Sequence, residues 1–281
     1  MFVNAPVLFQ GWSFTNKLEC LVLSQKNGPR NPATDLYTLL ESVLRLHKLS
    51  LNKILPTIPS PLPTLTFLAL TMLDLRDTPS RVALFLDGIR TPSLRDVRIH
   101  CEREPTGSGT ALPALGHALA ARLCDAADVP ALTACRYVEY DNEWPAHVWL
   151  ELKTSEEEAE ARRLQLTFCY PDLGEARLVS SCLSALPLGG VTQAELGICS
   201  SEARVMPTIA HPRNDYVAFR TAFGGMHALE DILVHVYATV SPKDHILGID
   251  SLPRLFPSLK SLKLDGDPSL ARQIDLKARY F

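Results

Sequence analysis

The sequence predicts an α/β repeat protein in which short parallel strands alternate with helices along 281 residues. One observation is the spacing Pro-x-Leu-x-x-Leu-x-Leu, which recurs with little change in four copies that begin at Pro63, Pro92, Pro130 and Pro257. Because side chains alternate along a strand, the last two apolar positions of each copy lie on one face. The other observation is that segments with a helical spacing of apolar residues separate the copies. Each copy is therefore predicted to be a strand that is buried on one side.

A looser template, apolar-x-x-apolar-x-apolar, extends the prediction to nine strands. In chain order they are Leu18–Leu23, Leu46–Leu51, Leu65–Leu70, Leu94–Ile99, Leu132–Tyr137, Ala161–Leu166, Val191–Leu196, Leu229–Val234 and Leu259–Leu264. In these strands we expect Leu68, Leu262 and Leu264 to be buried. For the sixth strand a helix remains an alternative, because Glu158 and Arg162 have the i,i+4 spacing of a helix pair.

Four segments between these strands have the spacing of helices: Pro32–Leu44, Asp77–Gly88, Leu112–Ala127 and Leu173–Leu186. The first carries proline in its first turn, and the second begins at an Asp, Thr or Ser cap and ends at glycine. The alternation in Val148–Leu152 predicts a hairpin excursion, whereas Thr154–Glu160 has the composition of a helix start. Glu102–Thr110 is rich in loop-forming residues and is predicted to be a loop.

The strands recur at the spacing of a leucine-rich repeat. Successive strands begin 19 to 38 residues apart, and that repeat is roughly 20 to 29 residues long. The asparagine or cysteine expected three residues after the last leucine is present only as Cys169 and Cys199. We therefore predict a leucine-rich-repeat solenoid, a horseshoe with parallel strands on the concave face and helices and loops on the convex face, whose repeats are degenerate. The whole chain, 1–281, is predicted to be a single domain, with an N-terminal cap at 1–17, about nine irregular repeats at 18–265 and a C-terminal cap or tail at 266–281.

Composition argues against several classes of protein. A net charge of -3 does not favour nucleic-acid binding, which requires a basic surface. No apolar run reaches the roughly 18 to 20 residues that cross a bilayer, and the N-terminus lacks the basic region of a signal peptide. The seven cysteines are odd in number and contain no Cys-x-x-Cys pair, so we expect reduced, buried thiols. These features predict a cytoplasmic or nuclear protein.

The sequence also lacks the motifs of common enzymes. It contains no P-loop, nucleophile elbow, dinucleotide-binding glycine motif or paired metal ligands. Thr106–Thr110 is the nearest approach to a phosphate loop, but it lacks the following lysine and is predicted to be flexible. His100 and Cys101 are adjacent, so in a strand they point to opposite faces and cannot share a metal. We therefore predict a protein that is not an enzyme and that has no cofactor or metal.

The candidate site is the exposed side of the strands. In a leucine-rich repeat the residues between the buried ones line the concave sheet, and here many are charged. The candidate protein-binding residues are His47, Lys48, Phe67, Arg95, Arg98, Arg136, Gln193, Glu195, Glu230, Asp231, Lys260 and Lys263. We expect Arg95, Arg98 and Arg136 to form one exposed cluster, because adjacent strands are about 4.8 Å apart. These charges are either ordinary solvated surface or a docking face for an acidic protein partner.

Three stretches resemble one protein family. Leu62–Leu70, Phe85–Ile99 and Leu255–Leu264 are similar to the leucine-rich region of the expanded F-box proteins of mushroom-forming fungi, and the resemblance spans residues 18 to 265. In that family an N-terminal F-box docks on a Skp-type adaptor of a cullin-type ubiquitin ligase, and the repeats hold a substrate. The resemblance implies a non-enzymatic protein-interaction module that recognises a ubiquitylation substrate.

The F-box itself is not recognisable in this sequence. Nothing before Leu18 resembles the Leu-Pro-x-Glu-Leu-Leu signature of that motif, so we expect a Skp-type adaptor as a partner only if an F-box is encoded upstream. The alternative is a free-standing leucine-rich-repeat scaffold or inhibitor with no ligase role. Neither interpretation involves nucleic acid or a membrane as a partner.

Overall fold

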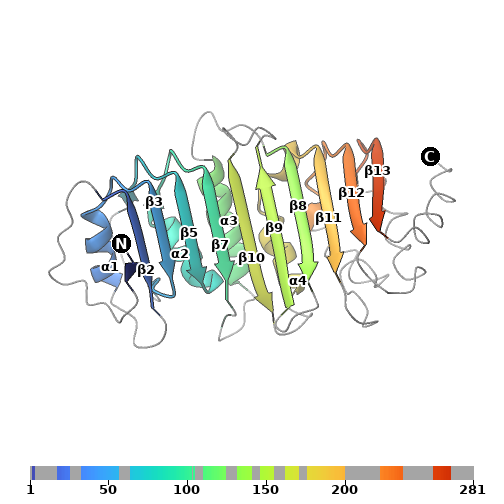
Figure 1. Cartoon of the computed structure of the whole chain (residues 1–281). Coiled ribbons are helices and arrows are strands. Elements are labelled where there is room, and N and C mark those ends of the chain that lie inside the picture. The colour runs from blue at the N-terminus through green and yellow to red at the C-terminus, as the bar shows by residue number, and fades with distance from the viewer. Residues whose placement is uncertain are drawn as a thin grey trace. The chain divides into compact units, whose positions relative to one another are not determined.

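The computed structural model describes residues 2–3, 18–25, 33–56, 64–102, 104, 110–124, 132–140, 146–154, 162–170, 176–199, 222–236 and 256–266 (Figure 1). The chain divides into two compact units. The first unit comprises Met1–Val129 with Arg162–Leu166, and the second comprises Pro130–Ala161 with Thr167–Phe281. Each unit is an α/β arrangement on a mostly parallel sheet, and the strand order is linear and does not close into a barrel. That the whole chain forms one domain stays a prediction.

The sheet of the first unit is parallel and its strands are in register. Its order is β1 (Phe2–Val3), β2 (Cys20–Ser24), β3 (Lys48–Asn52), β5 (Met72–Asp77) and β7 (Asp96–Cys101). The start of β10 (Arg163–Tyr170) follows β7, and the Arg163 N–H donates to the Arg95 carbonyl at 2.7 Å. Pairing aligns the buried residues in rows, of which one consists of Leu21, Leu49, Leu73 and Val97.

The helices of the first unit cover the apolar side of this sheet. They are α1 (Ala33–Glu41), α2 (Pro79–Asp87) and α3 (Ala111–Cys124), and α2 and α3 lie together behind the strands (Figure 1). Tyr37 of α1 meets Phe85 of α2 edge to face, with ring centroids 6.4 Å apart. Gly88 ends α2 with φ of -82°, so it is not needed for a left-handed turn. Instead, a side chain at Gly88 would collide with the Tyr37 hydroxyl.

The predicted third strand, Leu65–Leu70, is wrong. Leu65–Thr66 forms a short strand, β4, that pairs with β6 (Ile89–Arg90) in a separate two-stranded sheet. The strand of this repeat in the main sheet is β5, seven residues further on, and Leu68 is 69% exposed instead of buried. The physical reason is that Leu70, Leu73 and Leu75 also satisfy the template, and Leu73 and Leu75 align with the buried rows of β3 and β7.

The second unit repeats the parallel arrangement with one antiparallel strand. Its order is β9 (Ala146–Lys153), β8 (Ala134–Tyr140), β11 (Gln193–Cys199), β12 (Asp231–Val236) and β13 (Ser261–Gly266), with the later residues of β10 before β9. The antiparallel pairing of β8 with β9 confirms the predicted hairpin excursion. Cys135, Ala194, Ile232 and Leu262 are aligned by the pairing.

Most of the other predicted elements are confirmed. The Ala161–Leu166 segment belongs to strand β10 from Arg163 onward, which removes the helical alternative for those residues. The predicted helix Leu173–Leu186 contains α4 (Ala176–Leu183), followed by the 3-10 turn η2 (Leu188–Gly190). Leu262 is half-buried. The side chain of Leu264, residues 155–160 of the predicted helix start and most of the loop Glu102–Thr110 lie outside the described residues.

A backbone ladder holds the beginnings of the strands in line. In the first unit, the N–H groups of Thr71 and Met72 both donate to the carbonyl of His47, and those of Arg95 and Asp96 both donate to that of Thr71. The second unit contains the same pattern, in which the carbonyls of Thr133, Thr192 and Glu230 are the acceptors. Within each unit the ladder stacks residues that precede neighbouring parallel strands along the edge where those strands begin.

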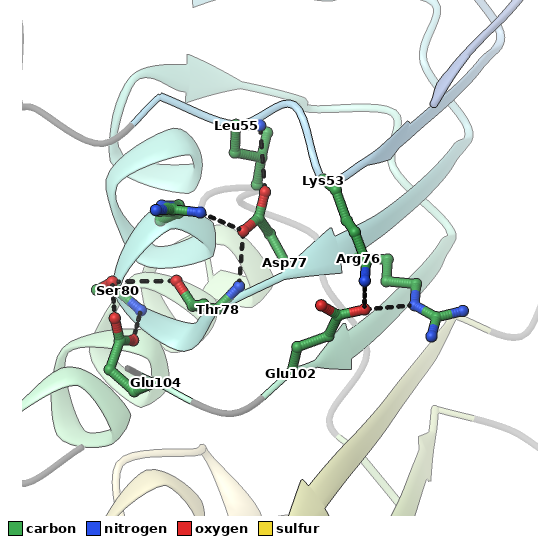
Figure 2. Close-up of polar contacts among 9 residues, drawn as sticks. Lys53, Leu55, Arg76, Asp77, Thr78, Ser80, Glu102 and Glu104 are labelled. Atoms are coloured by element: carbon green, nitrogen blue, oxygen red, sulfur yellow. Dashed lines mark hydrogen bonds and ion pairs between the residues drawn. The ribbon is translucent and has the colours of Figure 1, made fainter. Parts of the chain in front are cut away.

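A buried carboxylate joins β5 to α2 at the opposite edge of the first sheet (Figure 2). Asp77 is 1% exposed and accepts hydrogen bonds from the N–H groups of Leu55 and Thr78, at 3.2 and 2.9 Å, and from Arg81 at 3.1 Å. Glu104 accepts from the N–H and the hydroxyl of Ser80 in the first turn of α2. Two carboxylates therefore satisfy orphan donors at the helix N-terminus, where negative charge is also favoured by the helix dipole.

Candidate functional site

The exposed face of the first sheet carries polar residues between the buried rows. Across β2, β3, β5 and β7 the pairing places Val22, Ser50, Asp74 and Arg98 in one row. The Ser50 hydroxyl donates to Asp74 at 3.0 Å, so one neutral position of this row is joined to a charged one. The face is thus an organised polar surface, built by parallel strands in a common register.

Two arginines neutralise a carboxylate on this face. Asp96 Oδ2 accepts from Arg98 Nη2 at 2.8 Å and from Arg163 Nη2 at 3.1 Å. Burial by itself raises the pKa of Asp96, but the hydrogen bonds and charges of the two arginines outweigh burial and hold the pKa below its ordinary value. This cluster ties β7 to the start of β10, and its two arginines exceed its one carboxylate by a single positive charge.

A second charged cluster lies at the edge where the first unit's strands end (Figure 2). Glu102 Oε1 is 2.9 Å from Lys53 Nζ and 3.0 Å from Arg76 Nε. Burial raises the pKa of Glu102, but its bonds to Lys53 and Arg76 dominate and lower it below its ordinary value. Like the Asp96 cluster, this one links neighbouring strands by opposite charges.

The exposed face of the second unit forms a shallow hollow of about 430 Å³. The charged residues that line it are Arg136, Glu151, Lys153, Glu195, Asp231 and Lys263. Arg136 is 2.9 Å from Glu195, and Lys153 is 3.6 Å from Glu151. Within the described part of the chain, Asp231 and Lys263 take part in no ion pair. The hollow therefore contains both internally neutralised charges and charges of either sign that face solvent.

A histidine extends this charge network across three strands. His235 of β12 has Nε2 at 3.0 Å from Glu195 of β11 and Nδ1 at 2.9 Å from Asp265 of β13. The Nδ1 contact with Asp265 has hydrogen-bond geometry, whereas Nε2 approaches Glu195 without it. The network therefore holds the second unit's face together through side chains as well as through backbone pairing.

The structure places most of the predicted residues on exposed surface. Lys48, Gln193, Asp231 and Lys263 are exposed on strands, and His47 and Arg95 are exposed where strands begin. Glu230 and Lys260 pair with each other at 2.7 Å. Phe67, however, is 0% exposed, so its assignment to the binding face was wrong. The reason is the shifted third strand, because Phe67 follows β4 and points into the core.

The predicted arginine cluster is also wrong. Arg98 lies on β7, which is bordered by β5 and β10, whereas Arg136 lies on β8, which is bordered by β9 and β11. The two arginines are therefore not on neighbouring strands. Arg98 is engaged by Asp96 and Arg136 by Glu195. Of the three arginines, Arg95 alone has no ion pair with a described residue.

Sequence reasoning missed several charged residues of these faces. His235 and Asp265 follow the last apolar position of their strands, where continued alternation would have placed them on the exposed side. Glu151 and Lys153 belong to the hairpin strand β9, which the repeat template omits. Arg163 was assigned to a strand, but its pairing with Asp96 depends on a contact between distant segments.

Two thiols of the described residues are too deeply buried to suggest covalent chemistry. Cys135 and Cys182 are fully buried, and burial raises the pKa of the Cys182 thiol to about 12 and that of Cys135 still further. Thiols in such surroundings are poor nucleophiles at neutral pH. Among the described residues, no group of three or more His, Cys, Asp or Glu side chains is arranged to hold a metal ion.

Among the described residues, no helix is both long enough and apolar enough to cross a membrane.

In comparisons with protein-family models, with curated proteins and with solved structures, no match to this chain was found.

Proposed function

We propose that the chain is a leucine-rich-repeat solenoid that acts as a non-enzymatic protein-interaction module and binds its partner on the exposed faces of its sheets. The observation that supports this proposal best is the common register of the strands. Residues of β3, β5 and β7 that are 24 positions apart occupy equivalent places, as Ser50, Asp74 and Arg98 do. A repeat of that length is typical of leucine-rich repeats.

The exposed faces have the composition of a docking surface. They carry arginine and carboxylate side chains from several strands, and charges of both signs give specificity and faster association to a protein partner. The hollow of the second unit is shallow, as suits a protein surface better than a small substrate that must be enclosed. We further propose a cytoplasmic or nuclear location, which the free thiols of Cys20, Cys135 and Cys182 support.

Photo-crosslinking tests the use of the sheet faces. A photoreactive amino acid is placed at exposed strand positions, Lys48 in the first unit and Lys263 in the second. The controls carry it at exposed positions on the helix side, Thr38 of α1 and Ser184 after α4. We expect the same partner proteins to crosslink reproducibly from the strand positions and not from the controls. Equal crosslinking from both sides would contradict the proposal.

The ligase role follows only from the resemblance to F-box proteins and is tested separately. We propose that the partner is a ubiquitylation substrate, with a free-standing scaffold or inhibitor as the alternative. Because no F-box signature precedes Leu18, we expect the purified chain not to bind a Skp-type adaptor by itself. Tight one-to-one binding, measured by calorimetry, would reveal a docking element in the chain and exclude the scaffold alternative.

A further inference from the structure

A second hollow, of about 510 Å³, lies at the edge of the first sheet where the strands begin. Its described lining residues are His47, Ala69, Thr71, Ser93, Arg95 and Arg162, all of them in the first unit. The backbone ladder places three of these residues side by side, because the Thr71 N–H donates to the His47 carbonyl at 2.9 Å and the Arg95 N–H to the Thr71 carbonyl at 3.0 Å. The hollow is therefore built on fixed backbone and not on a single loop.

The described lining of this hollow is cationic. It contains two arginines and a histidine and no carboxylate. The nearby Asp96 does not compensate for them, because Arg98 and Arg163 already engage it. Arg95 is exposed and has no ion pair with a described residue. The hollow thus offers positive charge and N–H donors to an external anion.

The hydroxyl groups of Ser93 and Thr71, which line the hollow, already donate hydrogen bonds to backbone carbonyls. Ser93 Oγ donates to the carbonyl of Leu68 at 2.7 Å, and Thr71 Oγ1 donates to that of His47 at 3.1 Å. These bonds fix the walls and leave the guanidinium of Arg95 as the principal donor of the hollow. Guanidinium groups bind carboxylates in a planar, bidentate geometry.

An exposed leucine borders the hollow. Leu68 is 69% exposed and is the one large hydrophobic side chain in the described residues with such exposure. It directly precedes Ala69 of the lining, and the bond from Ser93 to its carbonyl holds its backbone in place. A single exposed leucine is unremarkable by itself, but here it adds an apolar surface beside a cationic one.

We propose that this hollow and Leu68 together bind a short acidic and aliphatic segment of a partner protein. A carboxylate of the segment pairs with Arg95, and an adjacent apolar side chain packs on Leu68. The proposal rests on the proposed function, since it names the chemistry of the partner. It also predicts binding that weakens with salt, because the charged contacts are exposed.

The test is an NMR titration of the ¹⁵N-labelled full chain with two peptides, acetyl-Glu-Leu-amide and its neutral analogue acetyl-Gln-Leu-amide. We expect only the acidic peptide to shift the amide signals of Thr71 and Arg95. The Arg95→Gln variant should lose this response, and Leu68→Ser should weaken binding by roughly fivefold through lost apolar contact. Arg76→Gln is the matched control, because Arg76 is an exposed arginine whose partner, Glu102, lies outside the hollow.

Several outcomes would overturn the proposal. They are equal shifts with the neutral peptide, an unchanged response in Arg95→Gln, or no shift of Thr71 and Arg95 at all. Circular dichroism checks that Arg95→Gln melts like the parent, as expected for an exposed residue. The glutamates of the Glu156–Glu160 run precede Arg162 in sequence. Tighter peptide binding after their change to glutamine would support a carboxylate site, since it would reveal competition from the chain itself.

This experiment separates the inference from the proposed function. If strand positions crosslink partners but the acidic peptide does not bind, the inference fails and the interaction role stands. If the peptide binds but crosslinking shows no preference for the sheet faces, the proposed docking on those faces fails.

Discussion

Single carboxylates carry much of the polar structure of the first unit. Asp77 is buried and serves two backbone N–H groups and one guanidinium, whereas Asp96 and Glu102 are more accessible and each serve two cationic side chains. Burial decides how much each contributes, because an unsatisfied donor costs more when water cannot replace the lost acceptor.

Asp77→Ala should therefore be strongly destabilising. The change leaves the buried N–H groups of Leu55 and Thr78 without this acceptor, and Arg81 without its pair, so we expect a loss of about 3 kcal/mol in the free energy of unfolding. Urea denaturation at neutral pH measures it. The matched control is Asp87→Asn on the exposed side of the same helix, which should change stability by less than about 0.5 kcal/mol. Similar losses in both variants would contradict this role for Asp77.

Asp96 should make stability depend on pH in the acid range. Its pKa is lower in the folded state than its ordinary value, so the folded state favours the ionised form. The resulting stabilisation is full above the unfolded pKa of about 3.9 and is lost as pH falls through the lower folded pKa. Arg98 and Arg163 are 44% and 36% exposed, and solvent screening limits the contribution to about 1 kcal/mol.

The Asp96→Asn variant measures this contribution. The difference in unfolding free energy between parent and variant should be constant above about pH 5 and should shrink below about pH 4. Urea denaturation at a series of pH values provides the measurement. A difference that grows as the solution becomes more acidic would contradict the lowered pKa of Asp96 in the folded state.

At the scale of the element, the position of the predicted third strand differs between sequence and structure and can be tested directly. The template fits both Leu65–Leu70 and Leu70–Leu75, and the structure places the second in the main sheet as part of β5. Leu73 is fully buried and Leu68 is exposed. The same residue type thus has opposite environments five positions apart.

Two matched substitutions distinguish the registers. Leu73→Ala should cost about 2 to 5 kcal/mol through lost transfer energy and a residual cavity. Leu68→Ala should change stability by no more than about 0.5 kcal/mol, because little buried surface is lost. Chemical denaturation of the two variants measures both values. A larger loss for Leu68 than for Leu73 would restore the register predicted from the sequence.

At the scale of the whole molecule, the proposed solenoid implies that a destabilising substitution affects only the neighbouring strands. In a solenoid each repeat contacts only its neighbours, so stability is close to a sum of neighbouring terms. In the sheets of both units, parallel strands pair in register with their neighbours.

Hydrogen exchange tests this locality. Leu73→Ala should accelerate exchange of the amides of β3, β5 and β7 and leave those of β11, β12 and β13 unchanged. Ile232→Ala, at an equally buried position of β12, should have the reciprocal effect. If either variant accelerates exchange equally in both sets of strands, the chain unfolds as one cooperative body and the solenoid proposal fails.

Much of the fold is predictable from local spacing, whereas less of the candidate site is. The period of 2 in strands and the period of 3.6 in helices are properties of short segments, and apolar spacing alone therefore located α1, α2, α3 and most strands. Arg98 and Arg136 were correctly placed on exposed strand positions. Their pairing with Asp96 and Glu195 was not predicted. The Arg136–Glu195 pair joins β8 to β11 and depends on which strands are neighbours, whereas Arg98 and Asp96 are two residues apart on β7, where alternation places them on one face.

The sequence by itself determined that strands and helices alternate and which side chains of most strands are buried. Only the tertiary structure decided the strand neighbours, the shift from β4 to β5, and the ionic partners of Arg98 and Arg136. The physical reason is that pairing is fixed by hydrogen bonds and burial between segments far apart in the chain. Two registers with equal local spacing are distinguished only when one of them aligns its leucines with the buried rows of the neighbouring strands.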